Sequence, residues 1–324
     1  MVQRLTDITQ VPGIYAANAQ DAQAGTGCTV IVCPQGATGG VDVRGGGPAT
    51  RETDLLRPEE MVQQIQAVVL SGGSAFGLAA SCGVAEELER RGIGFDVGVG
   101  VVPIVSSACL FDLACGDPHT RPDAAMGALA CRRALDEPGP LDQGNFGAGT
   151  GCTVGKFAGP DRIMKSGLGS AGYRSGDLLV AAVSAVNACG NVVDPTTGVP
   201  LAGMLDETGT AVQSIEDLLM DQGGHRPLER TNTTISCVVT NARLSKAQAT
   251  KLAQMSADAY AHAIRPTHTP NDGDTIFVLA TGDVEAPAMD VLGALAVRSL
   301  EDAIVAGVRK AQPAYGLKAA RDLA

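Results

Sequence analysis

The chain has 324 residues, of which 45% are hydrophobic and 18% charged, and its formal net charge is −11. The hydrophobic share excludes a disordered chain. The acidic balance argues against nucleic acids and anionic membrane surfaces as partners, because both attract Lys and Arg. Gly is abundant, at 41 residues, and Trp is absent, so small residues must fill much of the core and let its elements pack closely.

The uncharged segments and the cysteines indicate the cellular compartment of the protein. The uncharged runs Val97–Leu110 and Leu178–Val193 fall short of the ~18 residues that a membrane helix needs, so we expect buried strands or short helices there. The first residues lack the apolar core of a signal peptide. The nine Cys form no CxxC pair and no Cys/His cluster at zinc spacing. We therefore expect a soluble, cytoplasmic protein with buried or free thiols, no metal and no cofactor.

The first half of the chain alternates short apolar runs with turns. The β-branched run Cys28–Cys33 predicts a buried strand. Pro58, followed by two acidic residues, is typical of a helix start and predicts a helix over Met61–Ala67. A strand is then expected at Val68–Leu70.

A glycine-rich turn, Ser71–Ser74, follows this strand and precedes a predicted helix over Ala75–Arg91 that Gly92 ends. Such a turn between strand and helix can bind an anion through its free N–H groups. A compact turn without a ligand explains the same residues.

The second half begins with a long polar connection over Pro195–Arg230, which contains a short acidic helix near Ser214–Met220. The pattern then becomes strand, helix, strand, helix. The predicted elements are a strand at Ile235–Thr240, a helix over Lys246–Ile264 capped by Ser245, a turn at Asn271–Asp274, a strand at Thr275–Ala280, and a final amphipathic helix that carries Leu292, Leu295, Ile304 and Val308.

Familiar catalytic motifs are absent from the sequence. The four His (His119, His225, His262 and His268) are dispersed, and no Gly-x-Ser-x-Gly elbow is followed by an acid and a His. Asp272–Asp274 resembles a fragment of a calcium loop, but no Glu closes that loop. These patterns give no support to a Ser-His-Asp hydrolase or to a metal enzyme.

The junction of the polar connection with the next strand, Asn232–Ser236, is chemically suggestive. A Thr hydroxyl becomes a competent nucleophile when the α-amine of the same residue is free to act as its base. That condition requires cleavage just before Thr233, and the Thr233 hydroxyl could attack the Asn232 carbonyl in an N-to-O shift. Consecutive Thr residues at a strand start are equally explained by β propensity, so the pattern alone leaves both interpretations open.

Four sequence blocks resemble the L-aminopeptidase/D-esterase (DmpA-like) family of self-processing hydrolases, which includes the nylon-oligomer hydrolase branch (NylC). The similarity runs from about Leu5 to Lys310, and the last block is the most specific. The blocks are Val41–Gly47 with Arg51–Asp54, Leu70–Leu78, Val186–Asp194, and Asn232–Ser236 with Asp272–Thr275.

The resemblance implies an α/β fold, a four-layer αββα sandwich shared with ornithine acetyltransferases. It implies one catalytic domain, residues 1–324, that cuts itself at Asn232–Thr233 into fragments 1–232 and 233–324. Thr233 would be the nucleophile, and Asn187 would hold the oxyanion. Lys156, Asp272 and Asp274 match active-site residues of the nylon-hydrolase branch. Without the resemblance, we would expect Lys156 to be a surface lysine, and Asp272 and Asp274 to belong to an ordinary turn.

Substrate recognition departs from part of the family. Members that cleave dipeptides and β-peptides carry a Glu that binds the free amine of the substrate, where this chain has Ser106 and Ser107. The nylon-hydrolase branch shares the serines, and its nearby Tyr is matched by Phe111. We expect Ser107, Phe111, Gly72 and Gly73 to contact the substrate, which makes an amidase for an internal or non-peptide amide plausible.

The sequence thus predicts a threonine hydrolase that cleaves small amides or peptides through an acyl-enzyme and assembles as a homo-oligomer, a tetramer of processed pairs. Two alternatives stay open. One is an acyltransferase of the same fold, in which an amine takes the acyl group. The other is an unprocessed binding protein without catalytic activity.

Overall fold

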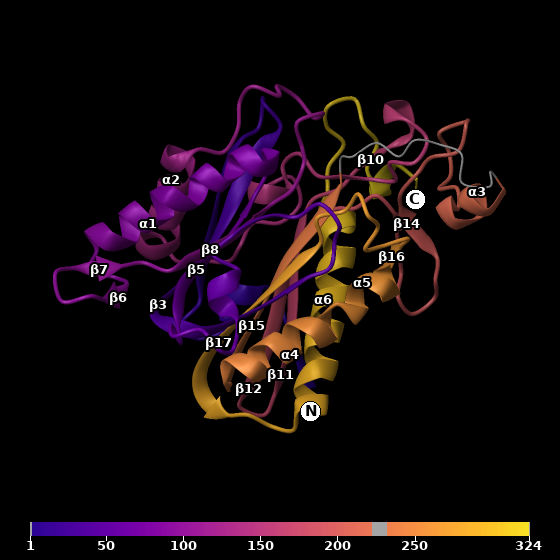
Figure 1. Cartoon of the computed structure of the whole chain (residues 1–324). Helices are drawn as coiled ribbons and strands as arrows, with labels where there is room; N and C mark the ends of the chain where they lie inside the picture. Colours follow the sequence, from indigo (N-terminus) through magenta and orange to yellow (C-terminus); the bar gives the residue numbers. More distant parts are fainter. Residues whose placement is uncertain (1, 222–231, 324) are drawn as a thin grey trace.

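The computed structural model describes residues 2–221 and 232–323. Helices flank a folded β-sheet on two sides (Figure 1). The α-helices are α1 (Ala80–Arg90), α2 (Ala124–Asp136), α3 (Ile215–Asp221), α4 (Lys246–Ser256), α5 (Asp258–Ala263) and α6 (Met289–Lys310). The strands are β1 (Val2–Leu5), β2 (Tyr15–Asp21), β3 (Thr26–Val43), β4 (Ala49–Arg51), β5 (Ile65–Ser71), β6 (Phe95–Asp96), β7 (Val101–Val102), β8 (Val105–Cys109), β9 (Thr153–Val154), β10 (Met164–Lys165), β11 (Leu168–Ser175), β12 (Leu178–Asn187), β13 (Asn191–Val193), β14 (Pro200–Ala202), β15 (Thr233–Arg243), β16 (Ile264–Arg265) and β17 (Thr275–Glu285).

The long strand β3 joins two β layers. Its first half pairs with β2 and β5, and its second half, Thr38–Val43, pairs with β17. One layer therefore has the order β2-β3-β5-β8-β4, and the other has the order β1-β11-β12-β15-β17-β3. Both halves of β3 are largely buried, which explains its continuous β-branched and small-residue sequence.

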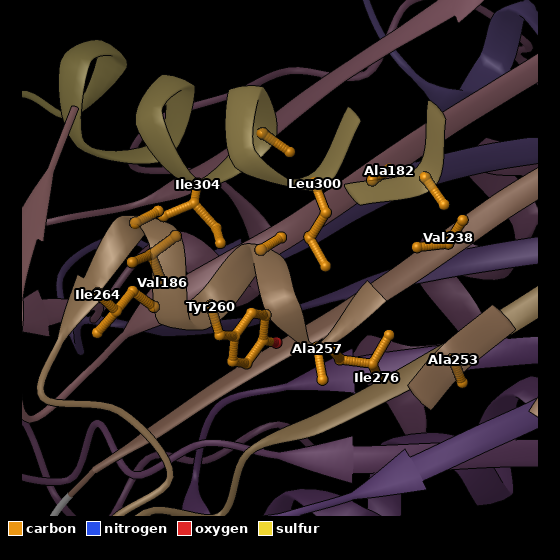
Figure 2. Packing of buried hydrophobic residues seen from close by; sticks show 14 of the residues in the cluster. Ala182, Val186, Val238, Ala253, Ala257, Tyr260, Ile264, Ile276, Leu300 and Ile304 are labelled. Atoms are coloured by element: carbon orange, nitrogen blue, oxygen red, sulfur yellow. The ribbon is translucent and has the colours of Figure 1, made fainter. Parts of the chain in front are cut away.

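Three apolar clusters separate four layers of structure. The middle cluster joins the two β layers through residues such as Val68 and Val183. A second packs α1 and α2 on the outer face of the first layer. The third packs α4, α5 and α6 on the outer face of the other layer, and Figure 2 shows Leu300, Ile304 and Tyr260 gathered there over the sheet. The predicted αββα sandwich is therefore confirmed.

The sheet brings the candidate site residues to one edge. β15 runs parallel to β17 and antiparallel to β12. The starts of two parallel strands meet at the same sheet edge, where an antiparallel neighbour ends. Thr233 begins β15, Asp272–Asp274 precedes β17 and Asn187 ends β12, so these three segments converge.

The two predicted fragments share one sheet. β15 and β17, from residues 233–324, lie between β12 and the second half of β3, from residues 1–232. Cleavage at Asn232–Thr233 would leave both ladders intact, so separation of the fragments would require breaking the centre of the sheet.

One predicted element is wrong. Residues Met61–Ala67 form no helix: a turn and bends follow Arg57, and β5 begins at Ile65. Every residue of β5 is buried between β3 and β8. Burial on both faces of the sheet therefore favours a strand for this β-branched run, and it outweighs the helix-start signal of Pro58.

Two predicted helices have different bounds. Residues Ser74–Ala79 form 3-10 turns before α1, because the chain folds back so tightly that a Cβ on Gly77 would lie 1.9 Å from the Gly72 carbonyl oxygen. The helix predicted over Lys246–Ile264 breaks after Ser256 into α4 and α5. The break directs Tyr260 of α5 under the start of β15 (Figure 2).

The uncharged run Val97–Leu110 is buried only in its second half. The first half forms part of an exposed hairpin of β6 and β7, where Val99 is 97% exposed and Gly98 turns the chain with φ +80°. Leu178–Val193 forms buried β12 and β13, as expected. Residues 222–230 of the Pro195–Arg230 connection, with residue 231 after them, lie outside the described residues. In the described ranges, no helix is long and apolar enough to span a bilayer.

Helix α6 supplies a test of the packing. Leu300 is fully buried against the sheet, whereas Val291 on the same helix is 49% exposed. We expect Leu300→Ala to lower the free energy of unfolding by about 2–5 kcal/mol, because it leaves a cavity. Val291→Ala should change it little. Denaturant titration of both variants checks this, and equal effects would contradict the packing of α6.

Candidate active site

Thr233 and Asn187 face each other across the β12–β15 ladder as register partners. Both are buried, with Thr233 4% and Asn187 0% exposed. The Thr233 hydroxyl donates a hydrogen bond to the carbonyl oxygen of Asn232. The hydroxyl thus lies beside the carbonyl that self-cleavage would attack.

The Asn187 side chain is fixed at both ends. Its Oδ1 accepts hydrogen bonds from the Lys156 ammonium at 2.8 Å and from the Thr153 backbone N–H at 3.0 Å. Its Nδ2 donates to the Phe111 carbonyl at 2.9 Å, and an amide nitrogen has a second N–H to offer. This network orients the amide nitrogen rather than leaving it free to rotate.

Lys156 is not a surface lysine. It is 8% exposed, and its Nζ also donates to the Asn187 backbone carbonyl at 3.0 Å. Burial lowers the pKa of Lys156 to about 8, against the opposing influence of groups that include Cys189 and Asp272. A lysine with this pKa is still mostly protonated at neutral pH and loses its proton in mildly alkaline solution.

Asp274 and Asp272 are held by the segment Thr267–Thr269. Asp274 accepts the Thr234 backbone N–H at 2.9 Å on one oxygen, and on the other it accepts bonds from Thr267 and His268. Asp272 accepts the hydroxyl of Thr269 at 2.6 Å and its N–H at 3.2 Å. The Asp274 carboxylate therefore contacts β15, the strand that begins at Thr233, directly.

The two carboxylates influence each other. Burial, and then the charge of Asp274, raise the pKa of Asp272 to about 6. Asp272 also accepts a long bond of 3.4 Å from the N–H of Cys189, two residues after Asn187. The Asp pair is thereby linked to the segment that carries Asn187, so it is more than a turn.

A glycine segment, Gly45–Gly47, packs directly on the turn Asp272–Asp274, here called the Asp turn. The N–H of Gly47 donates to the Asp272 carbonyl at 2.9 Å, and that of Gly45 donates to the Asp274 carbonyl at 3.3 Å. A Cβ on Gly45 would lie 2.2 Å from the Asp272 carbonyl oxygen, whereas a Cβ on Gly47 would meet its nearest atom at 3.9 Å. The turn can approach β3 only because Gly45 has no side chain.

A cavity of about 430 Å³ adjoins Lys156. Phe111 lies on its wall, as do Asp112, Thr153 and Tyr315. The Phe111 carbonyl holds Asn187, so this residue links the cavity to the site. The cavity lining combines apolar and acidic groups.

The other residues expected to contact substrate lie elsewhere. Ser107 is buried in β8, outside the cavity lining, and in the described part of the chain its hydroxyl has no hydrogen-bond partner. Gly72 and Gly73 pack on the Asp112 carboxylate, which accepts the Gly73 N–H at 2.7 Å. The turn thus binds an anionic group, but that group belongs to the protein.

Two buried charges near the site were not singled out from the sequence. Burial raises the pKa of Asp112 to about 6 and lowers that of Lys165 to about 8. Lys165 is fully buried and its ammonium donates to the carbonyls of Gly149, Cys152 and Ser166. It thereby fixes the loop that leads into Thr153. No local motif surrounds either residue, so the sequence offered no signal.

The cysteines and possible metal ligands add no further chemistry. All nine Cys are free, and only Cys82 is exposed. In residues 2–221 and 232–323, no group of three or more His, Cys, Asp or Glu is arranged to hold a metal ion.

The Gly45 contact provides a matched test of how the Asp turn is held. We expect Gly45→Ala to lower the free energy of unfolding by about 1–3 kcal/mol, because the new methyl group overlaps the backbone of the turn. Gly47→Ala should have nearly the same free energy of unfolding as the unsubstituted protein. Thermal and denaturant unfolding measure both, and a Gly45→Ala protein as stable as Gly47→Ala would contradict the close approach.

Comparisons with known proteins identify the family. The profile of Peptidase family S58 matches residues 5–321. The chain is 42% identical over 304 residues to an uncharacterized aminopeptidase of Mycobacterium leprae, covering 89% of this chain and 82% of the relative. It is 30% identical over 308 residues to a 6-aminohexanoate-oligomer endohydrolase of Kocuria sp., covering 91% and 83%.

A solved structure gives the same result for the fold. The L-aminopeptidase D-Ala-esterase/amidase of Ochrobactrum anthropi, a variant of the Ntn-hydrolase fold, superposes with a TM-score of 0.70 at 19% identity and covers 95% of this chain and 86% of its own. The family resemblance, including the nylon-hydrolase branch, is therefore confirmed. The chain belongs to Peptidase family S58 and is an amide-bond hydrolase with the Ntn-hydrolase fold.

Proposed function

We propose that this hydrolase processes itself between Asn232 and Thr233 and then uses Thr233 to cleave small amides or peptides through an acyl-enzyme. The observation that carries the proposal is the position of the Thr233 hydroxyl against the Asn232 carbonyl, opposite Asn187 in the sheet. A buried lysine donates a hydrogen bond to Asn187, and the two buried carboxylates accept N–H groups from Thr234 and Cys189, which lie one residue after Thr233 and two after Asn187.

Self-cleavage proceeds in two balanced steps. The Thr233 oxygen attacks the Asn232 carbonyl carbon, the C–N bond breaks, and the proton of the hydroxyl ends on the released amine. The result is an ester between Asn232 and Thr233. Water then hydrolyses the ester, which leaves a carboxylate on Asn232 and a free α-amine on Thr233.

The free α-amine acts as the base in turnover. It takes the proton of the Thr233 hydroxyl as the oxygen attacks the substrate carbonyl, and it returns that proton to the leaving amine. Water then attacks the acyl-enzyme by the same route. The second N–H of Asn187 supports a role as oxyanion donor, since only one is engaged by Phe111.

Charges around Thr233 act on this amine with opposite signs. Asp274 and ionised Asp272 favour the protonated amine and raise its pKa, whereas the Lys156 ammonium lowers it. Because the pKa of Lys156 is lowered to about 8 and that of Asp272 raised to about 6, both act at neutral pH. We expect the balance to leave a useful fraction of the amine unprotonated there.

The substrate proposed is an internal or non-peptide amide. The endohydrolase relative is named for its action on 6-aminohexanoate oligomers. In this chain Ser106 and Ser107 are uncharged and buried in β8, so they offer no negative charge to bind a free amine. The cavity bordered by Phe111 and Lys156 is large enough for a small acyl chain. We further propose a cytoplasmic homo-oligomer, a tetramer of processed pairs.

The processing step is tested by intact mass. The unsubstituted protein should split into fragments 1–232 and 233–324, with Thr233 as the new N-terminal residue, whereas Thr233→Ala should stay one chain. Thr233→Ser is the control, because it retains a hydroxyl and should still be cut. A new N-terminus at any other residue would overturn the assignment.

The same preparations separate the alternatives. An uncut, inactive chain after long incubation supports a binding protein. Transfer of an acyl group to ornithine in preference to water supports an acyltransferase.

The oxyanion role predicts a selective kinetic loss in Asn187→Ala. We expect the catalytic rate constant to fall by ~10²–10³ with little change in substrate binding, because the oxyanion exists only along the reaction path. Self-cleavage forms a similar oxyanion, so the cut form must be purified first. A fully cut Asn187→Ala protein that hydrolyses a model amide at the unsubstituted rate would rule out this role.

A further inference from the structure

His268 lies in the segment between β16 and β17 and contacts one of the two candidate carboxylates. Its Nδ1 is 2.8 Å from Oδ2 of Asp274, and its backbone N–H donates to the same oxygen at 3.1 Å. The other oxygen of Asp274 accepts the N–H of Thr234. A short chain of contacts therefore joins the imidazole to the residue after the nucleophile.

The imidazole itself is held from the other side. It stacks on Tyr260 of α5, with 5.6 Å between ring centroids and 20° between planes. The Tyr260 hydroxyl lies 2.7 Å from Ser236 Oγ and donates to the Thr234 carbonyl at 3.1 Å. Within residues 2–221 and 232–323, the buried Nε2 of His268 has no hydrogen-bond partner. In the neutral ring the proton is thus expected on Nδ1, which faces a carboxylate.

The backbone of His268 also matters. Its φ is +54°, in the left-handed region that Gly adopts freely and Asn tolerates better than most residues. This conformation lets the N–H and the side chain of one residue bind the same oxygen of Asp274. The geometry needs both a left-handed backbone and a donor at the Nδ1 position.

We propose that His268 is a positioning residue whose Nδ1–H fixes the Asp274 carboxylate so that its second oxygen stays on the N–H of Thr234. This inference rests on the proposed function, since it assigns the support of a carboxylate in that site. His268 touches neither substrate nor the reacting atoms, so its effect is transmitted through Asp274.

Two substitutions separate the donor from the backbone. His268→Asn retains a tolerated left-handed backbone and places an amide N–H near the Nδ1 position. His268→Gly retains the backbone and removes the donor. In cut protein we expect His268→Gly to lower the catalytic rate constant about 10-fold or more with KM nearly unchanged, because a hydrogen bond to a charged group is lost. His268→Asn should recover most of that loss.

Rescue by His268→Asn distinguishes this role from simple support of the fold. In the described residues the ring contacts Asp274 through Nδ1 and Tyr260 by stacking. Both variants lose the stacking contact, and His268→Asn keeps a donor for Asp274, so recovery of kcat in His268→Asn isolates the effect of the donor. Equal losses of kcat in both variants would overturn the proposal.

A second measurement does not depend on cleavage or turnover. Imidazole ¹⁵N NMR of Thr233→Ala should show a proton on Nδ1 of His268, and Asp274→Asn in that background should shift this signal. A ring without a proton on Nδ1, or a signal that does not change in Asp274→Asn, would overturn the proposal. Failure of the unsubstituted chain to split would instead contradict the proposed function while leaving this measurement valid.

Discussion

The pairing of β12 with β15 is the constraint on which the site depends. Its last rung sets Asn187 opposite Thr233 in a fully buried ladder, and the parallel pairing of β15 with β17 brings Asp272 and Asp274 to the same edge. A slip of one residue in either pairing would turn these side chains to the other face of the sheet. The register of two central strands therefore fixes the site more firmly than any loop could.

Burial gives the site its electrostatic character. Moving a charge into a low-dielectric interior disfavours the ionised form of both acids and bases. Lys156 and Asp272 are consequently shifted toward neutrality, and each retains polar partners: backbone and amide oxygens around the lysine, and donors from Thr269 and Cys189 around the carboxylate.

The sequence predicted the layers better than it predicted some boundaries. The resemblance carried by the family blocks implied the αββα sandwich that the structure has. The five candidate catalytic residues are linked by strand pairing and hydrogen bonds, and their catalytic roles stay predictions. The helix expected over Met61–Ala67 failed because burial on both faces of β5 is a tertiary effect. His268, Lys165 and Asp112 carry no local motif, and their importance depends on contacts between residues distant in the chain. Ser107 was expected to contact the substrate because of the family resemblance, but it lies outside the cavity lining.

The proposed function depends on acylation of Thr233. Acylation is tested most directly by mass spectrometry of the protein quenched in acid during turnover of an activated ester or amide, followed by peptide mapping. We expect an acyl group on the peptide whose first residue is Thr233. An acyl group on Cys82, on Lys156 or on a serine, with Thr233 unmodified, would contradict it.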